Sequence, residues 1–287
     1  MELLQLKMFE TSDARHAGVS PNDLRVAVAS GELVRLKRGW YTANRLEWPA
    51  DRHRLLTEIE SRERLWAIPS HYSAALLFGL PVFRPDWSVI HLMRTEHGPA
   101  QNRAGVVIHK KVGEHAGPSV ALAVAQTALF CPVSGLMAYD AALHSQQISP
   151  VDLDAVAKQL TGWTGCAHVG VVRRLGDRRR ESPLESRTAL TFDRWGMVIE
   201  SQFAVPGTTF TADGRIRGTR LLVECDGEGK YPDQAAVLAE KARENENRAH
   251  GWAMVRVTDD LLDRPKLLHA RVLSALKSAR GLGEAAA

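Results

Sequence analysis

The chain has 287 residues, of which 45% are hydrophobic and 24% are charged, with 37 Lys and Arg against 33 Asp and Glu. This composition is typical of a globular protein and excludes a chain that is disordered throughout. At roughly 150 residues per domain, the length predicts two domains, or three if one is small. The formal net charge of +4 is mild, so it permits a nucleic-acid partner without requiring one.

Membrane insertion and secretion are not expected from the sequence. The longest apolar run, residues 120–131, is interrupted by Gln126 and is shorter than the roughly 18 residues that a membrane helix needs. The chain does not open with a charged segment followed by an apolar one, so we expect no secretory signal. The three cysteines are far apart and form no C-x-x-C pair, which argues against a disulfide framework and a structural zinc site. We therefore expect a cytoplasmic protein without a membrane partner.

Residues 1–48 are predicted to form two short helices followed by a basic hairpin. The first helix covers residues 11–17, and Ser20-Pro21-Asn22-Asp23 is a helix start with a capping serine and a proline in the first turn. Gly31 ends this second helix, and residues 32–42 contain alternating apolar positions and an Arg-Gly turn, which indicate a hairpin. This order is the outline of a winged helix-turn-helix.

Such a module is suited to binding a DNA duplex, with the second helix in a groove and the hairpin on the phosphates. The candidate nucleic-acid-binding residues are Ser20, Asn22 and Arg25 on the helix, and Arg35, Lys37 and Arg38 on the hairpin. The alternative is a winged-helix fold that contacts another protein, because the second helix carries only one arginine and one aspartate. We favour double-stranded DNA as the partner.

Three segments of this module resemble a known family. They are Ala17-Gly18-Val19-Ser20, Gly31-Glu32-Leu33-Val34-Arg35 and Arg38-Gly39-Trp40-Tyr41. They are similar to the N-terminal winged helix of AbiEi-type antitoxins and transcriptional regulators. The resemblance implies that the module binds operator DNA and represses its own operon, and that a cognate toxin or antitoxin protein is a further partner.

Residues 49–176 are expected to form a middle α/β domain that also resembles the AbiEi-type regulators. The predicted elements are helices at 55–66, 70–79, 123–130, 135–143 and 151–160, and strands at 87–93 and 105–110. His71, His91 and His109 lie on separate elements without a short H-x-x-x-H pair, so structural or surface histidines are favoured over a metal site. Asp140 is expected to be an internal hydrogen-bonding group.

A third domain is expected to begin at residue 177, where arginines flank a glycine. The segments Arg173-Arg174 and Arg178-Arg179-Arg180 stand on either side of Gly176. This pattern favours a solvated hinge between domains. The alternative is a strap that contacts phosphates between two nucleic-acid-binding modules.

Residues 177–287 contain carboxylates that a strand hairpin would bring together. Glu185 follows Ser182-Pro183 in a capping box, which alone would explain it structurally. Asp213 ends one predicted strand, residues 214–219 form a turn, and Glu224 and Asp226 lie on the next strand at the two-residue period. Clustered carboxylates repel one another unless a divalent cation or a proton compensates, and metal-dependent phosphodiester hydrolysis uses this arrangement.

The C-terminal part resembles the PD-(D/E)XK nucleases, and more narrowly the very-short-patch-repair-like endonuclease domain. The matching segments are residues 181–185, 212–213, 222–227, 251–252 and 255–258, in the predicted order helix, strand, strand, helix, strand, helix. The resemblance implies that Asp213 and Glu224 bind Mg²⁺ or Mn²⁺, with Glu185 completing the site. The motif lysine is replaced by Asp226. Lys241, or less favoured Lys230, is expected to supply the missing charge.

These patterns favour one function over another. The favoured function is a DNA-binding, divalent-metal-dependent nuclease of a toxin–antitoxin or phage-defence system, with Glu185, Asp213, Glu224, Asp226 and Lys241 as catalytic residues. The alternative is a non-enzymatic AbiEi-type antitoxin or transcriptional repressor with a degenerate nuclease domain. The expected fold class is α+β or α/β in both cases.

Overall fold

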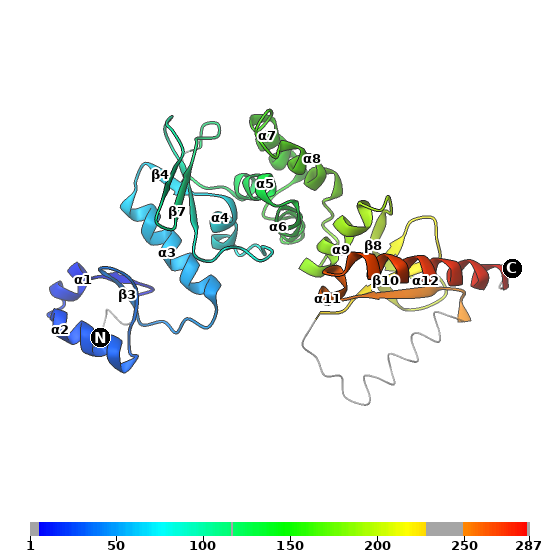
Figure 1. Cartoon of the computed structure of the whole chain (residues 1–287), viewed down its shortest axis with the longest axis horizontal. Coiled ribbons are helices and arrows are strands. Elements are labelled where there is room, and N and C mark those ends of the chain that lie inside the picture. Colours follow the sequence, from blue (N-terminus) through cyan, green and yellow to red (C-terminus); the bar gives the residue numbers. More distant parts are fainter. Residues whose placement is uncertain (1–5, 116, 228–248, 286–287) are drawn as a thin grey trace. The chain divides into compact units, whose positions relative to one another are not determined.

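The computed structural model describes residues 6–115, 117–227 and 249–285. The chain is a mixed α/β protein with two compact units, one built from residues 1–79 and 84–123 and the other from residues 80–83 and 124–287 (Figure 1). None of the helices in the described part of the chain combines the length and apolar composition that a bilayer-spanning helix requires.

The first unit begins with a small helical module on a three-stranded sheet. Its elements are β1 (Phe9–Glu10), α1 (Thr11–His16), α2 (Pro21–Ser30), β2 (Val34–Lys37) and β3 (Trp40–Thr42), with the antiparallel strand order β1-β3-β2. Ser20 caps α2, as predicted, because its hydroxyl accepts the Asp23 N–H and the Asp23 carboxylate accepts the Ser20 N–H. Gly31 ends the helix with a φ of +82°, a conformation that glycine adopts readily. Leu24 and Leu33 are buried in the core of this module.

A second sheet follows in the same unit. Its elements are α3 (Pro49–Glu63), β4 (Ala67–Pro69), α4 (His71–Leu77), β5 (Ile90–Arg94), β6 (Gln101–Arg103) and β7 (Val106–His109), and the strand order is β4-β5-β7-β6. β5 and β7 are parallel, whereas β4 and β6 run antiparallel to their neighbours. α3 starts at residue 49 rather than 55, because Pro49 occupies the first turn and Asp51 accepts the Trp48 N–H.

Four helices connect to the C-terminal sheet: α5 (Val120–Phe130), α6 (Pro132–His144), α7 (Pro150–Gln159) and α8 (Cys166–Leu175). α8 was not predicted, since it has no side-chain cap and begins after Gly165 in a left-handed conformation. A Cβ at Gly165 would lie 2.1 Å from the Leu129 carbonyl oxygen, so the close approach to α5 requires glycine.

The C-terminal sheet has four strands with the order β11-β10-β9-β8. The elements of this region are α9 (Pro183–Asp193), β8 (Ile199–Ala204), β9 (Thr211–Ile216), β10 (Leu221–Cys225), β11 (Ala253–Val257), α11 (Asp259–Leu262) and α12 (Pro265–Ala285). β10 and β11 are parallel and the other pairs are antiparallel. The sheet is packed against α9 and α12 through a core that includes Phe192, Leu221 and Val272.

The C-terminal sheet differs from the sequence prediction in two respects. β8 was not predicted, and β9 continues through residues 214–216, so the turn is shorter than the expected 214–219. The helix expected at 235–249 lies outside the described residues except for its last position.

The predicted hinge near residue 177 is not a solvated linker. Arg173 and Arg174 belong to α8, and Arg180 is buried against Asp140 within the second unit. Asp140 is an internal hydrogen-bonding group, as predicted.

Candidate functional site

The structure brings Asp213 and Glu224 together across the β9–β10 hairpin. They lie one position beyond the last register pair, Gly214 and Val223. The Asp213 N–H donates to Glu224 Oε1 at 3.3 Å, and the Cys225 N–H donates to Asp213 Oδ2 at 2.7 Å. Backbone amides therefore fix the Asp213 carboxylate and contact that of Glu224.

Glu185 approaches this pair from the first turn of α9. Its N–H donates to the Ser182 hydroxyl at 3.2 Å, and the same hydroxyl donates to Glu185 Oε1 at 2.8 Å. Gln202 on β8 donates to Glu185 Oε2 at 3.2 Å. Glu185 is thus a capping residue, as its capping box indicated, and its carboxylate is also held by a residue of the sheet.

Burial disfavours the charged forms of Asp213 and Glu185. Burial raises the pKa of Asp213, and the negative charges of Asp226 and Glu181 raise it further, against the Cys225 hydrogen bond. Burial also raises the pKa of Glu185, with Asp213 contributing repulsion. A cation placed between these groups would relieve both effects.

The oxygen donors fit the hard cations Mg²⁺ and Mn²⁺, which prefer carboxylate ligands. Asp213, Glu224 and Glu185 would hold such an ion. Among the described residues, however, these carboxylates do not form a group whose ligand atoms all lie within 4.8 Å of one another. Binding would therefore have to draw the carboxylates inward.

Asp226, which stands at the position of the motif lysine, forms an ion pair with Arg256. Asp226 Oδ2 lies 3.0 Å from Arg256 Nη1, and Arg256 is the register partner of Glu224 on the neighbouring strand β11. Lys230 and Lys241 lie outside the described residues. The described cation beside the carboxylates is thus an arginine that the sequence analysis did not single out.

Cys225 is the last residue of β10, between Glu224 and Asp226, and packs against the hydrophobic core; Asp226, which was predicted to lie on this strand, follows its end. Burial raises the pKa of its thiol, and Sγ lies 3.5 Å from the Thr188 hydroxyl. A buried thiol with a raised pKa is a poor nucleophile, so we assign it no catalytic role.

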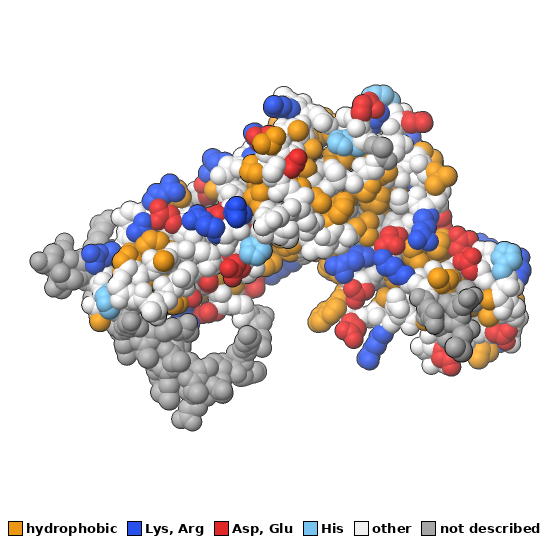
Figure 2. All heavy atoms as spheres, turned by 180° about the vertical axis from the view of Figure 1, so that it is seen from behind, with side chains coloured by type: hydrophobic (Ala, Val, Ile, Leu, Met, Phe, Trp, Pro, Cys, Tyr) orange, Lys and Arg blue, Asp and Glu red, His pale blue; other side chains and the backbone are white. Residues whose placement is uncertain are grey.

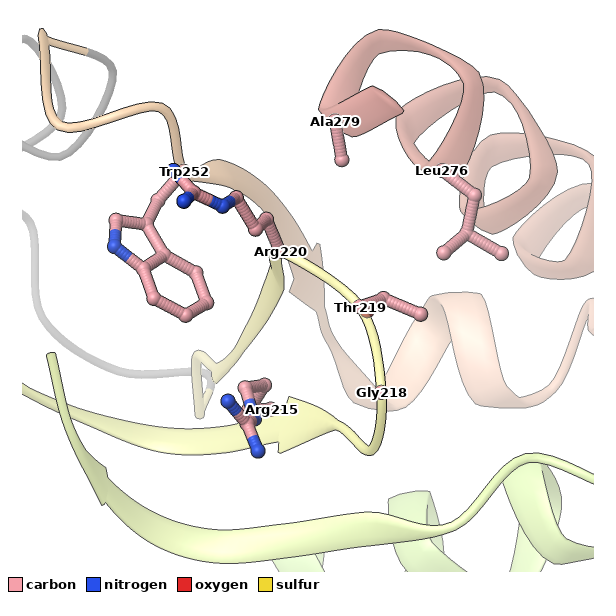
Figure 3. A pocket seen from close by; sticks show the side chains of 7 residues that line it. All are labelled: Arg215, Gly218, Thr219, Arg220, Trp252, Leu276 and Ala279. Carbon is pink, nitrogen blue, oxygen red and sulfur yellow. The ribbon is translucent and has the colours of Figure 1, made fainter. Parts of the chain in front are cut away.

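A separate cavity of 560 Å³ lies at the hairpin turn between β9 and β10, beside α12 (Figure 3). Arg215, Arg220 and Trp252 line one side, and Leu276 and Ala279 line the other. Asp213, Glu224, Glu185 and Asp226 are not among its lining residues. This cavity is therefore distinct from the carboxylate cluster.

In the N-terminal module, the predicted groove-facing residues lie at the start of α2 and are exposed. Ser20 is occupied by its capping box with Asp23. Arg25 Nη2 donates to Asn22 Oδ1 at 2.9 Å, so these two side chains are presented together.

The three basic residues of the hairpin are not equivalent. Arg35 and Arg38 are exposed, whereas Lys37 Nζ lies 2.6 Å from Glu60 Oε1 and 2.8 Å from Glu63 Oε2 of α3. Partial burial opposes the charge on Lys37, but the hydrogen bonds to both glutamates raise its pKa.

On the face seen in Figure 2, basic and acidic side chains are interspersed, in keeping with the modest net charge.

The structure also brings together His71, His91 and His109, which the sequence analysis placed on separate elements and interpreted as structural or surface histidines. Each of them offers one ligand nitrogen, and these three atoms all lie within 4.8 Å of one another. The available signal was the pair of neighbouring strand segments that each carry a histidine, but the parallel pairing of β5 with β7 cannot be read from local sequence.

The comparisons with known proteins bear on the N-terminal module. Residues 1–44 match a family model described as "Transcriptional regulator, AbiEi antitoxin". No curated protein matches the chain. The match covers α1, α2 and the hairpin and ends before α3. It supports a regulator or antitoxin type of protein, with DNA or a toxin as the class of partner.

Proposed function

We propose that the chain is a DNA-binding transcriptional regulator of the AbiEi antitoxin type, and that residues 1–44 form a winged helix-turn-helix that contacts the duplex. The family match over these residues carries the proposal. The order of α1, α2 and the β2–β3 hairpin supports it, because a second helix followed by a basic hairpin is how such modules reach a groove and the adjacent backbone.

The exposed polar side chains of α2 would contact base edges, and those of the hairpin would contact phosphates. Arg25 and Asn22 lie at the N-terminal part of α2, where recognition helices contact bases, and their mutual hydrogen bond orients both side chains. Arg35 and Arg38 on the hairpin would bind phosphates. Lys37 instead connects the hairpin to α3, because its ammonium group donates hydrogen bonds to Glu60 and Glu63.

A gel-shift titration of the full chain tests this proposal, using the duplex upstream of its own coding sequence and a scrambled duplex of the same length. We expect tighter binding to the upstream duplex and a weakening with salt. Arg25→Ala should reduce the preference between the two duplexes, while Arg15→Ala on α1 serves as the matched control. Equal, salt-independent binding to both duplexes would contradict the proposal.

We infer, as a second candidate function, a divalent-metal-dependent nuclease in the C-terminal part. The observation that favours it is the meeting of Asp213, Glu224 and Glu185 from three separate elements, with burial raising the pKa of Asp213 and of Glu185. Structural carboxylates are usually neutralised by partners, whereas Asp213 is described with a backbone amide as its hydrogen-bond donor.

In this mechanism the carboxylates of Asp213 and Glu224 would hold the cation, and a bound cation would supply Lewis acidity toward the scissile phosphate. The Cys225 and Asp213 amides hold the two carboxylates in place. Arg256, the register partner of Glu224, would supply positive charge to the phosphate oxygens, although it cannot act as a base because its guanidinium stays protonated. Lys230 or Lys241 remains the proposed source of a second charge.

A cleavage assay separates the two functions. Plasmid, single-stranded DNA and RNA are incubated with Mg²⁺, Mn²⁺ or EDTA, with wild type, Glu224→Gln and the control Glu200→Gln. Glu200 lies on β8 and is paired with Arg215 and Arg217. Metal-dependent cutting that is lost only in Glu224→Gln supports the nuclease. DNA binding by folded protein without cutting would leave the regulator as the function.

A further inference from the structure

Three imidazoles converge in the first unit, at the two central strands of the β4-β5-β7-β6 sheet and the start of α4. His71 is the first residue of α4, His91 lies on β5, and His109 is the last residue of β7. Nδ1 of His91 lies 2.8 Å from Nε2 of His109. The ring of His71 lies 3.8 Å, centroid to centroid, from that of His109 and 5.5 Å from that of His91. One ligand nitrogen from each residue falls within 4.8 Å of the others.

The pairing of β5 with β7 and the backbone conformation of His71 determine where these three rings lie. The parallel register places His109 opposite Met93, two residues beyond His91, so both histidines lie on one face of neighbouring strands. His71 has a φ of +51°, which is unfavourable for a residue with a side chain and is found where the surroundings impose it. The backbone thus adopts a strained conformation at the residue that completes the cluster.

Neighbouring side chains position the His71 ring and the backbone that carries His91. The Ser70 hydroxyl lies 3.0 Å from His71 Nδ1, which leaves Nε2 as the ligand atom that we assign to His71. The Ser73 hydroxyl accepts the His91 N–H at 2.9 Å and contacts His53 Nε2 at 2.8 Å. The Tyr72 ring packs edge-on against His91 at 4.5 Å. Outer partners that fix ring orientation are a regular feature of histidine metal sites.

We propose that His71, His91 and His109 bind one zinc ion, with the fourth coordination position open to water. Three imidazole nitrogens without a carboxylate suit zinc, whereas Mg²⁺ and Ca²⁺ require oxygen ligands. His71 and His91 are buried and His109 is partly exposed, so solvent reaches the site from the side of His109. A three-histidine set with an open position is the ligand pattern of reactive rather than purely structural zinc.

The geometry requires a small rearrangement. Zinc–nitrogen distances of about 2.05 Å at tetrahedral angles place ligand nitrogens about 3.3 Å apart. The His91–His109 pair, at 2.8 Å, must open slightly, and the nitrogen of His71 must move toward them. Side-chain rotations of this size leave β5 and β7 in register. The bound ion would tie α4 to both strands, and it depends on neither the proposed DNA contacts nor the carboxylate cluster.

The test uses untagged full-length protein, stripped with EDTA and titrated with zinc sulfate by calorimetry. We expect one zinc per chain. His109→Gln and His91→Gln should each weaken binding about 100-fold or more, since even outer partners of such sites contribute 10- to 100-fold. The matched control is His97→Gln, an exposed histidine of the same unit, which should bind like wild type.

Two further measurements keep the result independent of variant folding. Co²⁺ bound to the wild-type protein should give the intense visible absorption of a tetrahedral site, displaced by zinc. In a long-range proton–nitrogen NMR spectrum, zinc should shift three imidazoles and leave the others in place. Absence of zinc binding by wild type, equal binding by folded His109→Gln, or shifts confined to other histidines would each overturn the proposal.

Discussion

Arg180 Nη1 donates to Asp140 Oδ2 at 2.7 Å, and the two side chains are only 5% and 2% exposed. The same oxygen accepts the Ser186 hydroxyl at 2.7 Å, and Oδ1 accepts the Asp177 N–H at 2.8 Å. The Asp140 carboxylate of α6 thus binds the segment that leads into α9 at three points. This segment is therefore part of the core of the second unit.

Arg180→Met is expected to destabilise this unit by about 3–5 kcal/mol, because it leaves the Asp140 carboxylate buried without its cation. Burial already raises the pKa of Asp140, and Arg180 is the main group opposing that rise. Urea unfolding followed by circular dichroism measures the loss. Arg178→Met, at an exposed neighbouring position, should stay within about 0.5 kcal/mol of wild type. Equal effects of the two substitutions would show that the pair contributes little.

The sequence predicted helix starts well because they depend on local hydrogen bonds. Ser20 and Ser182, each followed by proline, are predicted to begin helices or a capping box, and both are N-caps in the structure. A serine hydroxyl and a proline in the first turn act within four residues, so tertiary contacts are not needed to recognise them.

Other features depend on contacts between distant segments, which local patterns do not contain. Lys37 was read as a phosphate contact, but Glu60 and Glu63 reach it from a helix more than 20 residues away. Arg180 was read as part of a hinge because its partner, Asp140, is 40 residues distant. The histidine cluster depends in the same way on the pairing of β5 with β7.

Lys37 and Arg38 are adjacent but should respond differently to substitution. Arg38→Met is expected to weaken DNA binding several-fold and to reduce the slope of log affinity against log salt by about 1, the effect of losing one phosphate contact. Lys37→Met should change that slope little, because its ammonium group is held by Glu60 and Glu63. Gel-shift titrations at several salt concentrations give both slopes. Matching losses of slope would mean that Lys37 leaves α3 to bind DNA.

Asp213→Asn is expected to raise the melting temperature at pH 7 while abolishing any metal-dependent cleavage. The pKa of Asp213 is raised in the folded chain, so folding becomes less favourable as pH rises from the ordinary aspartate pKa through the raised one. That cost is present in full at any pH above the raised pKa, and the amide removes it. Mg²⁺ should raise the melting temperature of wild type more than that of the variant.

Glu200→Gln is the control for this substitution. Glu200 is half-buried, and hydrogen bonds to Arg215 and Arg217 hold its pKa below the ordinary value despite that burial. Its substitution should therefore not raise the melting temperature, and the response to Mg²⁺ should remain. A Mg²⁺ response of Asp213→Asn equal to that of wild type would exclude Asp213 as a ligand.

In the presence of EDTA, the first unit is expected to lose stability as pH falls from about 6.5 toward 4. Burial lowers the pKa of His71, His91 and His109. Repulsion from the neighbouring imidazoles lowers the pKa of His71 and His91 further. The pKa falls to about 3 for His91 and to about 4 for His109. Unfolded histidines titrate near pH 6.5, so across this window the unfolded chain binds more protons and acid favours unfolding. Asp86 opposes the shift at His91, and His53 adds to it.

The slope of the free energy of unfolding against pH gives the number of protons that the chain takes up when it unfolds. His109→Gln should reduce the proton uptake on unfolding by about one between pH 4.5 and 6, measured by urea titrations at several pH values. His97→Gln, at an exposed position, should leave the slope near that of wild type. Saturating zinc should raise stability at pH 7 and steepen the loss in acid, because protons then compete with the metal for the same nitrogens. A slope unchanged by both His109→Gln and zinc would mean that the cluster neither stays neutral in the folded chain nor holds the ion.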